Sequence, residues 1–151
     1  MMRVYLVIMD ETDEASAALR FASRRAARTG GVLHLLALLP RQEFVAFGGV
    51  QATMEEEARL RAEALVTGAA GSLLSEGGQA PVIAVQSGDG VQVVREYLTA
   101  HPEVSALVLG AAEHGGPGPL VAHFAGVAGQ LACPLYVIPG GLDDETLDRL
   151  S

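Results

Sequence analysis

The chain has 151 residues, of which 50% are hydrophobic and 5% aromatic, and its formal net charge is −8. This length fits one domain, and the hydrophobic fraction is ample for a core built mainly from Ala, Val and Leu. The ten cationic residues, all Arg, are outnumbered by 18 acidic residues. Because an acidic surface repels phosphate backbones, we expect no nucleic-acid partner.

The cysteine content and the N-terminal sequence bear on the compartment. A single cysteine, Cys133, cannot form an intramolecular disulfide, which suits a reducing environment. The apolar run at residues 3–9 stops at Asp10 without a cleavage-site pattern, so it indicates a buried strand rather than a signal peptide. No apolar stretch reaches the length needed to cross a bilayer. We expect a cytoplasmic protein with no membrane contact.

The first half of the chain alternates between strand and helix patterns. Residues 3–9 (RVYLVIM) predict a buried parallel strand, and Thr12 is a candidate N-cap of a helix that Gly30 and Gly31 end. Residues 32–39 (VLHLLALL) predict a second strand. The segment 40–54 has no clear period; its Phe44 and Phe47 fit a hydrophobic cover of the sheet edge or a dimer contact, with a lid over the ligand cleft as the alternative.

The second half continues the same alternation. Residues 54–76 predict a helix whose core-facing positions are Leu60, Ala64, Leu65 and Ala69. A short strand at 81–86, a helix at 91–101 and a strand at 104–109 follow. The glycine-rich loop 110–118 leads into a helix at 119–132, and residues 135–138 predict the last strand. We expect one domain over residues 1–140 and an acidic tail, with one or two helical turns, over 141–151.

Alternating strands and helices imply right-handed crossovers around a parallel sheet. We therefore predict a three-layer α/β/α fold of the flavodoxin-like or Rossmann-like type, with five parallel strands in the order 3-2-1-4-5. Ligands of such sheets bind at the carboxyl ends of the strands, where the winding reverses. That rule places Asp10 beside the loop 110-GAAEHGGPGPL-120 and makes this loop the main functional candidate.

Four segments carry a resemblance to a known family: residues 7–38, the turn and helix start 87-SGDGVQVVREYL-98, the strand end 107-LVLG-110, and 133-CPLYVIPG-140. In this order and spacing they resemble the universal stress protein family. The resemblance implies a role in stress tolerance and a homodimer formed through the last strand, from Leu135 to Ile138. It also implies a division between members that bind ATP and members that do not.

The nucleotide motif of the family reads Gly-x2-Gly-x9-Gly-(Ser/Thr), and this sequence departs from it. Counting from Gly110, the later positions hold Glu113, His123 and Phe124 in place of two glycines and a hydroxyl. We therefore predict a non-enzymatic, dimeric binding module with weak or no ordinary ATP affinity. The alternative is an ATP- or AMP-binding member that acts as a nucleotide-dependent switch, and slow ATP hydrolysis stays open.

The candidate nucleotide or anion site follows from the switch point and from the resemblance. Its residues are Asp10, Leu38, Leu109, Gly110, Gly115, Gly116 and Gly118. The resemblance gives Asp10 a contact with the nucleoside, and Leu38 and Leu109 the lining of an adenine pocket. Each has a structural alternative: a cap or loop contact for Asp10, plain core for the leucines, and a compact turn for the glycines.

The histidines and the cysteine do not form a metal-binding pattern. His34 fits an interior position of a strand, and His101 stands at a helix end where the dipole favours it. His114 and His123 lie nine residues apart with too few further ligands for a metal site. Cys133 fits a small buried residue rather than a reactive thiol. We therefore expect no metal site.

Overall fold

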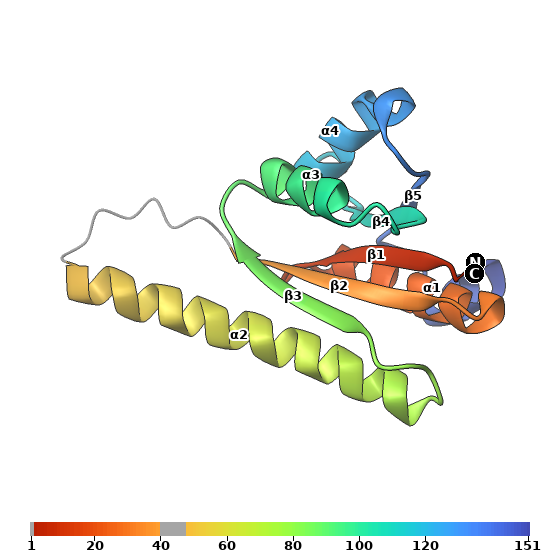
Figure 1. Cartoon of the computed structure of the whole chain (residues 1–151), viewed down its shortest axis with the longest axis horizontal. Coiled ribbons are helices and arrows are strands. Elements are labelled where there is room, and N and C mark those ends of the chain that lie inside the picture. The colour runs from red at the N-terminus through yellow and green to blue at the C-terminus, as the bar shows by residue number, and fades with distance from the viewer. Residues whose placement is uncertain (1, 40–47) are drawn as a thin grey trace.

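A computed structural model describes residues 2–39 and 48–151, so the predictions for Phe44 and Phe47 lie outside the described residues. Five parallel strands form one sheet in the order β3-β2-β1-β4-β5 (Figure 1). They are β1 Val4–Met9, β2 Val32–Leu39, β3 Val82–Ser87, β4 Ala106–Ala111 and β5 Leu135–Pro139. The predicted strand order is confirmed.

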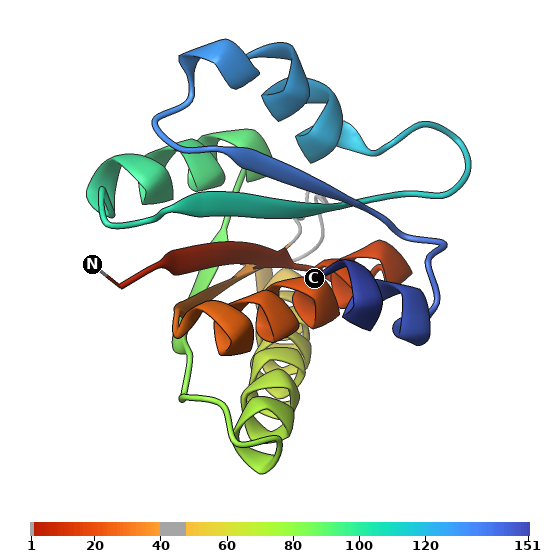
Figure 2. The ribbon, with the colours of Figure 1, turned by 90° about the vertical axis from the view of Figure 1, so that its right-hand side faces the viewer.

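Helices cover both faces of the sheet, which confirms the three layers. One face carries α1 (Asp13–Thr29), α2 (Gly48–Ser75) and α5 (Asp144–Leu150), and the other carries α3 (Gly90–Ala100) and α4 (Pro119–Gly126) (Figures 1 and 2). A short 3₁₀ turn, Ala128–Gln130, follows α4. No helix of the described part of the chain is long and apolar enough to cross a membrane.

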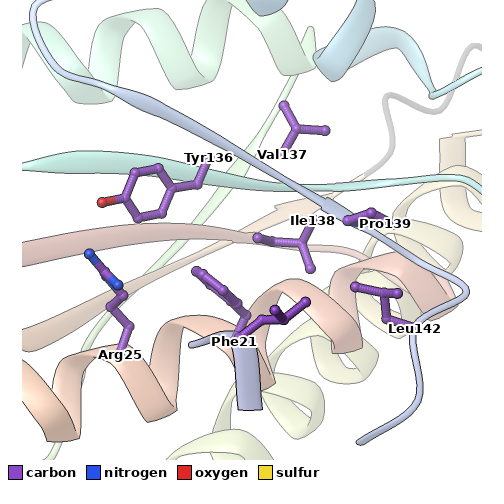
Figure 3. A pocket seen from close by; sticks show the side chains of 8 residues that line it. Phe21, Arg25, Tyr136, Val137, Ile138, Pro139 and Leu142 are labelled. Atoms are coloured by element: carbon purple, nitrogen blue, oxygen red, sulfur yellow. The ribbon is translucent and has the colours of Figure 1, made fainter. Parts of the chain in front are cut away.

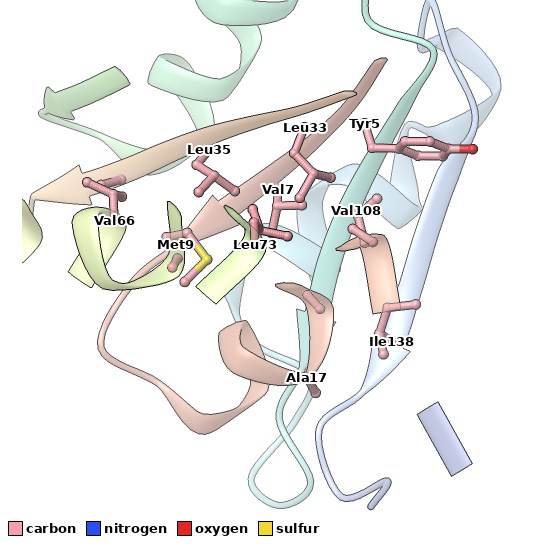
Figure 4. Packing of buried hydrophobic residues seen from close by; sticks show 14 of the residues in the cluster. Tyr5, Val7, Met9, Ala17, Leu33, Leu35, Val66, Leu73, Val108 and Ile138 are labelled. Carbon is pink, nitrogen blue, oxygen red and sulfur yellow. The ribbon is translucent and has the colours of Figure 1, made fainter. Parts of the chain in front are cut away.

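The central strand β1 is buried along its whole length, as a parallel strand between two helical layers requires. Tyr5, Val7 and Met9 face the layer of α1 and α2 (Figure 4). The alternate residues, Val4, Leu6 and Ile8, belong to the core on the side of α3 and α4. The period-two alternation of one strand thus supplies two separate hydrophobic cores.

The start and end of α1 follow from local sequence. Thr12 is the N-cap, and its Oγ1 accepts a hydrogen bond of 3.3 Å from the amide of Ala15. The acidic Asp13 and Glu14 occupy the first turn, where the helix dipole favours negative charge. Gly30 ends the helix with a φ of 66°, a left-handed conformation that favours glycine. Both predicted boundaries of α1 hold.

The predictions for α2 need correction. The helix begins at Gly48, six residues before the predicted start at Met54, and Leu60 is 55% exposed although the sequence assigned it to the core. Ala64 is also exposed. Leu65 is partly buried, and the fully buried stripe is Ala58, Ala62, Val66, Ala69 and Leu73. Small residues fill most of this stripe, so the positions of the leucines did not predict the buried face of α2.

Two boundaries near the glycine-rich loop also differ from the prediction. Gly110 lies inside β4 and not in the loop, because the ladder with β5 continues through Gly110 and Ala111, opposite Ile138 and Pro139. The fourth helix ends at Gly126 and not at residue 132. Glycines at 126 and 129 are poor helix formers, which accounts for the change to a 3₁₀ turn.

The C-terminal segment is docked on the domain. Leu147 of α5 is 1% exposed within the core on the α1 side. Arg20 of α1 forms a two-pronged hydrogen bond with Asp148, with Nε to Oδ1 at 2.9 Å and Nη2 to Oδ2 at 2.8 Å. Residues 144–150 are therefore helical and form part of the α1 layer.

Candidate functional site

A small cleft lies at the carboxyl ends of β1 and β4, the two strands at which the sheet reverses its winding. Its lining comes from the start of α1, the end of β4 and the start of α4: Ile8, Asp10, Thr12, Glu14, Ala15, Leu109, Gly110, Pro117, Gly118, Pro119, Leu120 and Val121. The described residues enclose about 120 Å³ there. That is less than the roughly 300 Å³ typical of the smallest ligand pockets.

Asp10 lies in this cleft, but its carboxylate already has local partners. Asp10 Oδ1 accepts hydrogen bonds from the amide of Thr12, at 3.0 Å, and from the Thr12 hydroxyl. The same hydroxyl accepts from the amide of Ala15 and so caps α1. Asp10 thereby holds the capping residue in place without capping α1 itself, and it lies in the cleft where the switch-point rule puts it.

Gly110 also lines the cleft, and close packing requires a glycine there. A Cβ at this position would lie 1.9 Å from the main-chain oxygen of Glu14, far inside van der Waals contact. The first turn of α1 therefore rests directly on the backbone of β4. Leu109, its neighbour, is 2% exposed and contributes to both the cleft and the core. The glycine that begins the family motif thus has a packing function of its own.

The glycines of the loop have a different function. Gly115, Gly116 and Gly118 have φ angles of 75°, 88° and 98°, and a Cβ on any of them would meet no atom within 4 Å. They allow a tight turn that the hydrogen bond from the Ala112 amide to the Pro117 carbonyl closes at 3.2 Å. Only Gly118 lines the cleft; Gly115 and Gly116 do not.

The start of α4 lines the cleft, and its first-turn amides have no partner within the helix. Gly118 is the N-cap and has no side chain to offer, and no other side chain among residues 2–39 and 48–151 caps the helix. Pro119 lacks an amide, and the amides of Leu120 and Val121 belong to the first turn, whose N–H groups have no partner within a helix. Such a helix start attracts an anion through its amides and its dipole.

Leu38 and Leu109, which were both expected to line an adenine pocket, lie in different places. Leu109 lines the cleft, whereas Leu38 does not. Leu38 is partly buried, and its Cδ1 lies 3.3 Å from a Cβ built on Gly90, with Leu120 Cδ2 at 3.4 Å from the same point. Leu38 is therefore on the α3 side of Leu120 and within the second core.

Eight of the twelve lining residues were not among the predicted site residues; they include Thr12, Glu14, Leu120 and Val121. Thr12 was assigned only as a helix cap. Leu120 and Val121 follow the glycine loop directly, so the rule that a helix N-terminus faces the switch point could have found them. Glu14 had no signal, because its place depends on how α1 sits on β4.

The charge of the lining is negative. Asp10 and Glu14 are its two ionisable residues, and no cation of the described residues lines the cleft. Neither nearby histidine changes this balance: His114 is exposed beside Glu113, and His123 is hydrogen bonded to Arg95 at 2.9 Å. A polyphosphate placed here would meet carboxylates without a compensating side chain from these residues.

A larger groove lies away from the switch point, between β5, α1 and α5 (Figure 3). It measures about 380 Å³ and is mostly apolar; its walls include Phe21, Tyr136, Ile138 and Leu142. Arg25 crosses one end, with its Cζ 5.7 Å from the centre of the Tyr136 ring. This groove lies along the edge strand β5 and has no link to the glycine loop.

At the opposite, amino end of the sheet, His34 is buried as predicted, with 6% of its surface exposed. Its Nδ1 is 2.8 Å from the hydroxyl of Tyr97, and burial lowers the pKa of His34, so the imidazole is neutral. Burial also raises the pKa of Tyr97. His101 is the C-cap of α3, in agreement with its predicted place at a helix end, and its ring stacks on Tyr97.

Cys133 is half-buried before β5, and burial raises the pKa of its thiol. The neutral thiol is a poor nucleophile, which supports the interpretation of Cys133 as a packing residue.

The fold and the switch-point cleft define a Rossmann-like α/β protein with a candidate ligand site at its carboxyl edge. The sequence profile of the universal stress protein family matches residues 1–139, and the chain belongs to this family. The resemblance drawn from the four segments is therefore confirmed. No curated protein matches the sequence significantly.

Solved structures agree with this assignment. Universal stress protein UspA from Lactobacillus plantarum has a TM-score of 0.73 at 20% identity, over 90% of this chain and 97% of that one. A universal stress protein in complex with cAMP has a TM-score of 0.62 at 16% identity, over 90% and 96%. The Archaeoglobus fulgidus protein in complex with dAMP has 0.58 at 16%, over 91% and 98%. At these identities the likeness establishes the fold.

Proposed function

We propose that the chain is a dimeric, non-catalytic binding module of the stress response whose switch-point cleft has weak or no ordinary affinity for ATP. Membership of the universal stress protein family supports the general role. One observation carries the statement about ATP: the cleft presents Asp10 and Glu14, and no described cation, to an incoming ligand. A triphosphate loses more hydration on entering such a site than these residues return.

A ligand with one phosphate fits the site better than a triphosphate. The uncapped start of α4 offers the amides of Leu120 and Val121, enough for a single anionic group. The neighbours in complex with cAMP and dAMP support this choice, because both ligands carry one phosphate. These observations favour the AMP form of the alternative function, a nucleotide-dependent switch, over its ATP form.

The proposal that the chain is not an enzyme rests on the hydrogen bonds that the polar side chains of the cleft already make. The Thr12 hydroxyl is the only hydroxyl of the described cleft lining. It donates to Asp10 and accepts from the Ala15 amide, so both its proton and a lone pair serve the start of α1. A nucleophile would need to be released from these contacts before it could react.

The nucleotide part is tested by calorimetry on the full chain after removal of bound nucleotide. We expect a dissociation constant above about 0.1 mM for ATP, and we expect AMP or cAMP to bind at least as tightly as ATP. Micromolar ATP affinity would replace the proposal with the ATP switch. Binding of none of the three would leave a module whose partner is a protein.

The dimer part of the proposal rests on the edge strand β5. Val137 is 39% exposed on this strand, and the apolar groove of Figure 3 runs beside it. An unpaired strand edge with apolar side chains is a template for association with a second copy. Each copy would add its β5 to the other and cover the groove.

A pair of matched substitutions tests this interface by light scattering after gel filtration. Val137→Arg places a charge on the β5 edge and should produce monomers. Val82→Arg places the same charge on the opposite edge, at β3, where Val82 is 49% exposed, and should leave the dimer intact. If Val82→Arg gives monomers and Val137→Arg does not, the interface is at β3 and the proposed β5 interface is wrong. A monomeric wild-type chain would also contradict the proposal.

A further inference from the structure

Three side chains with metal-binding atoms meet at the amino end of the sheet, away from the cleft. His34 belongs to β2, His101 caps the end of α3, and Glu103 follows two residues later. One ligand atom of each lies within 4.8 Å of those of the other two. No sequence pattern joins them, because His34 and His101 lie far apart along the chain and belong to different elements.

His34 is held in an orientation that leaves one ring nitrogen for a ligand. Its Nδ1 is hydrogen bonded to the Tyr97 hydroxyl at 2.8 Å, and Tyr97 is itself 8% exposed. When Nδ1 donates to the hydroxyl oxygen, Nε2 carries the lone pair. A hydrogen bond of this kind, behind a metal-binding histidine, fixes the tautomer and orients the ring. Among the described residues, the structure shows no hydrogen bond at His34 Nε2.

His101 offers the nitrogen that faces the carboxylate. Its Nδ1 is 2.8 Å from Glu103 Oε1, and an ion bound by these two atoms replaces the proton between them. The ring is stacked on Tyr97, with 4.1 Å between ring centres, and meets the edge of His34 at 5.7 Å. Tyr97 thus supports both imidazoles, one through its hydroxyl and one through its ring face.

Glu103 supplies the negative charge of the group. Its Oε1 faces His101 Nδ1, so both atoms can contact one ion placed between them. Two neutral imidazoles and one carboxylate form the ligand set of many zinc sites that keep a fourth position for water. In a tetrahedral complex with bonds of about 2.0–2.1 Å, ligand atoms lie closer than 4.8 Å, so the group must contract slightly. His101 and Glu103 have side chains 36% and 48% exposed, so a small movement of both can close the group around an ion.

We propose that His34, His101 and Glu103 bind a divalent transition-metal ion, Zn²⁺ by preference, with Tyr97 positioning the two histidines. This proposal departs from the sequence expectation of no metal site, which considered His114, His123 and Cys133. It is independent of the proposed nucleotide function, because the two sites are at opposite ends of the strands. A failed zinc titration and a failed nucleotide titration therefore test different statements.

The test uses the full chain, treated with a chelator and then titrated with Zn²⁺ by calorimetry. Co²⁺ provides a second readout, since its visible absorption reports its coordination. We expect one ion per chain, and at least about tenfold weaker binding in His101→Gln and in Glu103→Gln. His114→Gln is the matched control, because the His114 side chain is 88% exposed outside the group.

Because His34 is buried, a variant at that position can fail to fold, so the test relies on the two partly exposed ligands. Thermal unfolding of each metal-free variant shows that it is folded. Absence of stoichiometric uptake by the wild-type chain would overturn the proposal. Equal zinc binding by the wild-type chain, His101→Gln and Glu103→Gln would also overturn it, as would selective loss in His114→Gln.

Discussion

The two ends of the parallel sheet are built in different ways. At the carboxyl end, backbone geometry forms the candidate site: Gly110 lets α1 rest on β4, and Gly118 opens the start of α4. At the amino end, side chains do so: His34, Tyr97 and His101 contact one another through hydrogen bonds and ring stacking. The segment that corresponds to the family motif lies at the first end, and the proposed metal ligands lie at the second.

This difference shows that the position of a ligand site and the chemistry of its side chains are set separately. A fold fixes where ligands usually bind, at the carboxyl ends of the strands, but the side chains decide what can bind. The cleft keeps the position of the family site while its ionisable lining residues, Asp10 and Glu14, are acidic. The predictions below test whether each end depends on the groups assigned to it.

The largest effect is expected for Gly110→Ala. The new Cβ would lie 1.9 Å from the Glu14 carbonyl oxygen, so α1 must move away from β4. We expect a loss of at least about 3 kcal/mol in the free energy of unfolding, measured with denaturant. Gly129→Ala is the control, since a Cβ there meets nothing within 4 Å, and should change stability by less than about 0.5 kcal/mol. Equal stabilities of the two variants would contradict the packing account.

A second prediction concerns the amino end. Tyr97→Phe removes the hydroxyl that partners the buried His34 and should reduce the free energy of unfolding by about 2 kcal/mol. Tyr136→Phe removes a hydroxyl from the partly buried wall of the β5 groove, where no hydrogen bond of the described residues involves it. We expect that control to lie close to the wild type in thermal melts. A larger loss of stability in Tyr136→Phe than in Tyr97→Phe would contradict the importance given to the hydrogen bond between Tyr97 and His34.

A smaller effect is expected in the glycine loop. Gly116 has a φ of 88° with open space around its Cα, so Gly116→Ala introduces conformational strain without a clash. We expect a loss of about 1 kcal/mol in unfolding free energy, well below that of Gly110→Ala. Denaturant midpoints of the two variants, measured side by side, decide the matter. A loss at Gly116 as large as at Gly110 would show that the loop is packed.

The smallest effect depends on pH and involves α5, which lies at neither end. The hydrogen bond from Arg20 holds the pKa of Asp148 below its ordinary 3.8. A lowered carboxyl pKa stabilises the fold above the unfolded value, and this contribution is lost as the pH falls through the folded value. Asp148→Asn should therefore flatten the acid side of the stability profile below about pH 4. Asp144 Oδ2 lies 3.5 Å from the same guanidinium on a side chain that is 75% exposed, so Asp144→Asn should change the profile less than Asp148→Asn.

The sequence predicted much of this fold because its signals are local. The buried run of β1, the Thr12 cap and the Gly30 stop predicted β1 and α1 directly. Where packing decides, the sequence failed: the buried face of α2 follows Ala58 and Ala62 rather than Leu60, and Gly110 belongs to a strand.

The candidate site shows the same limit. Asp10, Leu109, Gly110 and Gly118 were found from the switch-point rule and the family resemblance. Glu14 could not be found, because only the contact between α1 and β4 brings it to the cleft. The group of His34, His101 and Glu103 depends on β2 and α3 meeting in space, which no spacing in the sequence reveals.

The central claim, that the cleft keeps its place in the family but does not hold ATP in the ordinary way, is tested most directly by amide NMR. The ¹⁵N-labelled full chain, free of nucleotide, is titrated with ATP while the amide signals of Gly110, Gly118 and Leu120 are followed. We predict that these signals stay in place when ATP and the protein are each present at about 10 μM, well below the expected dissociation constant. Shifts that saturate at equimolar ATP would contradict the account.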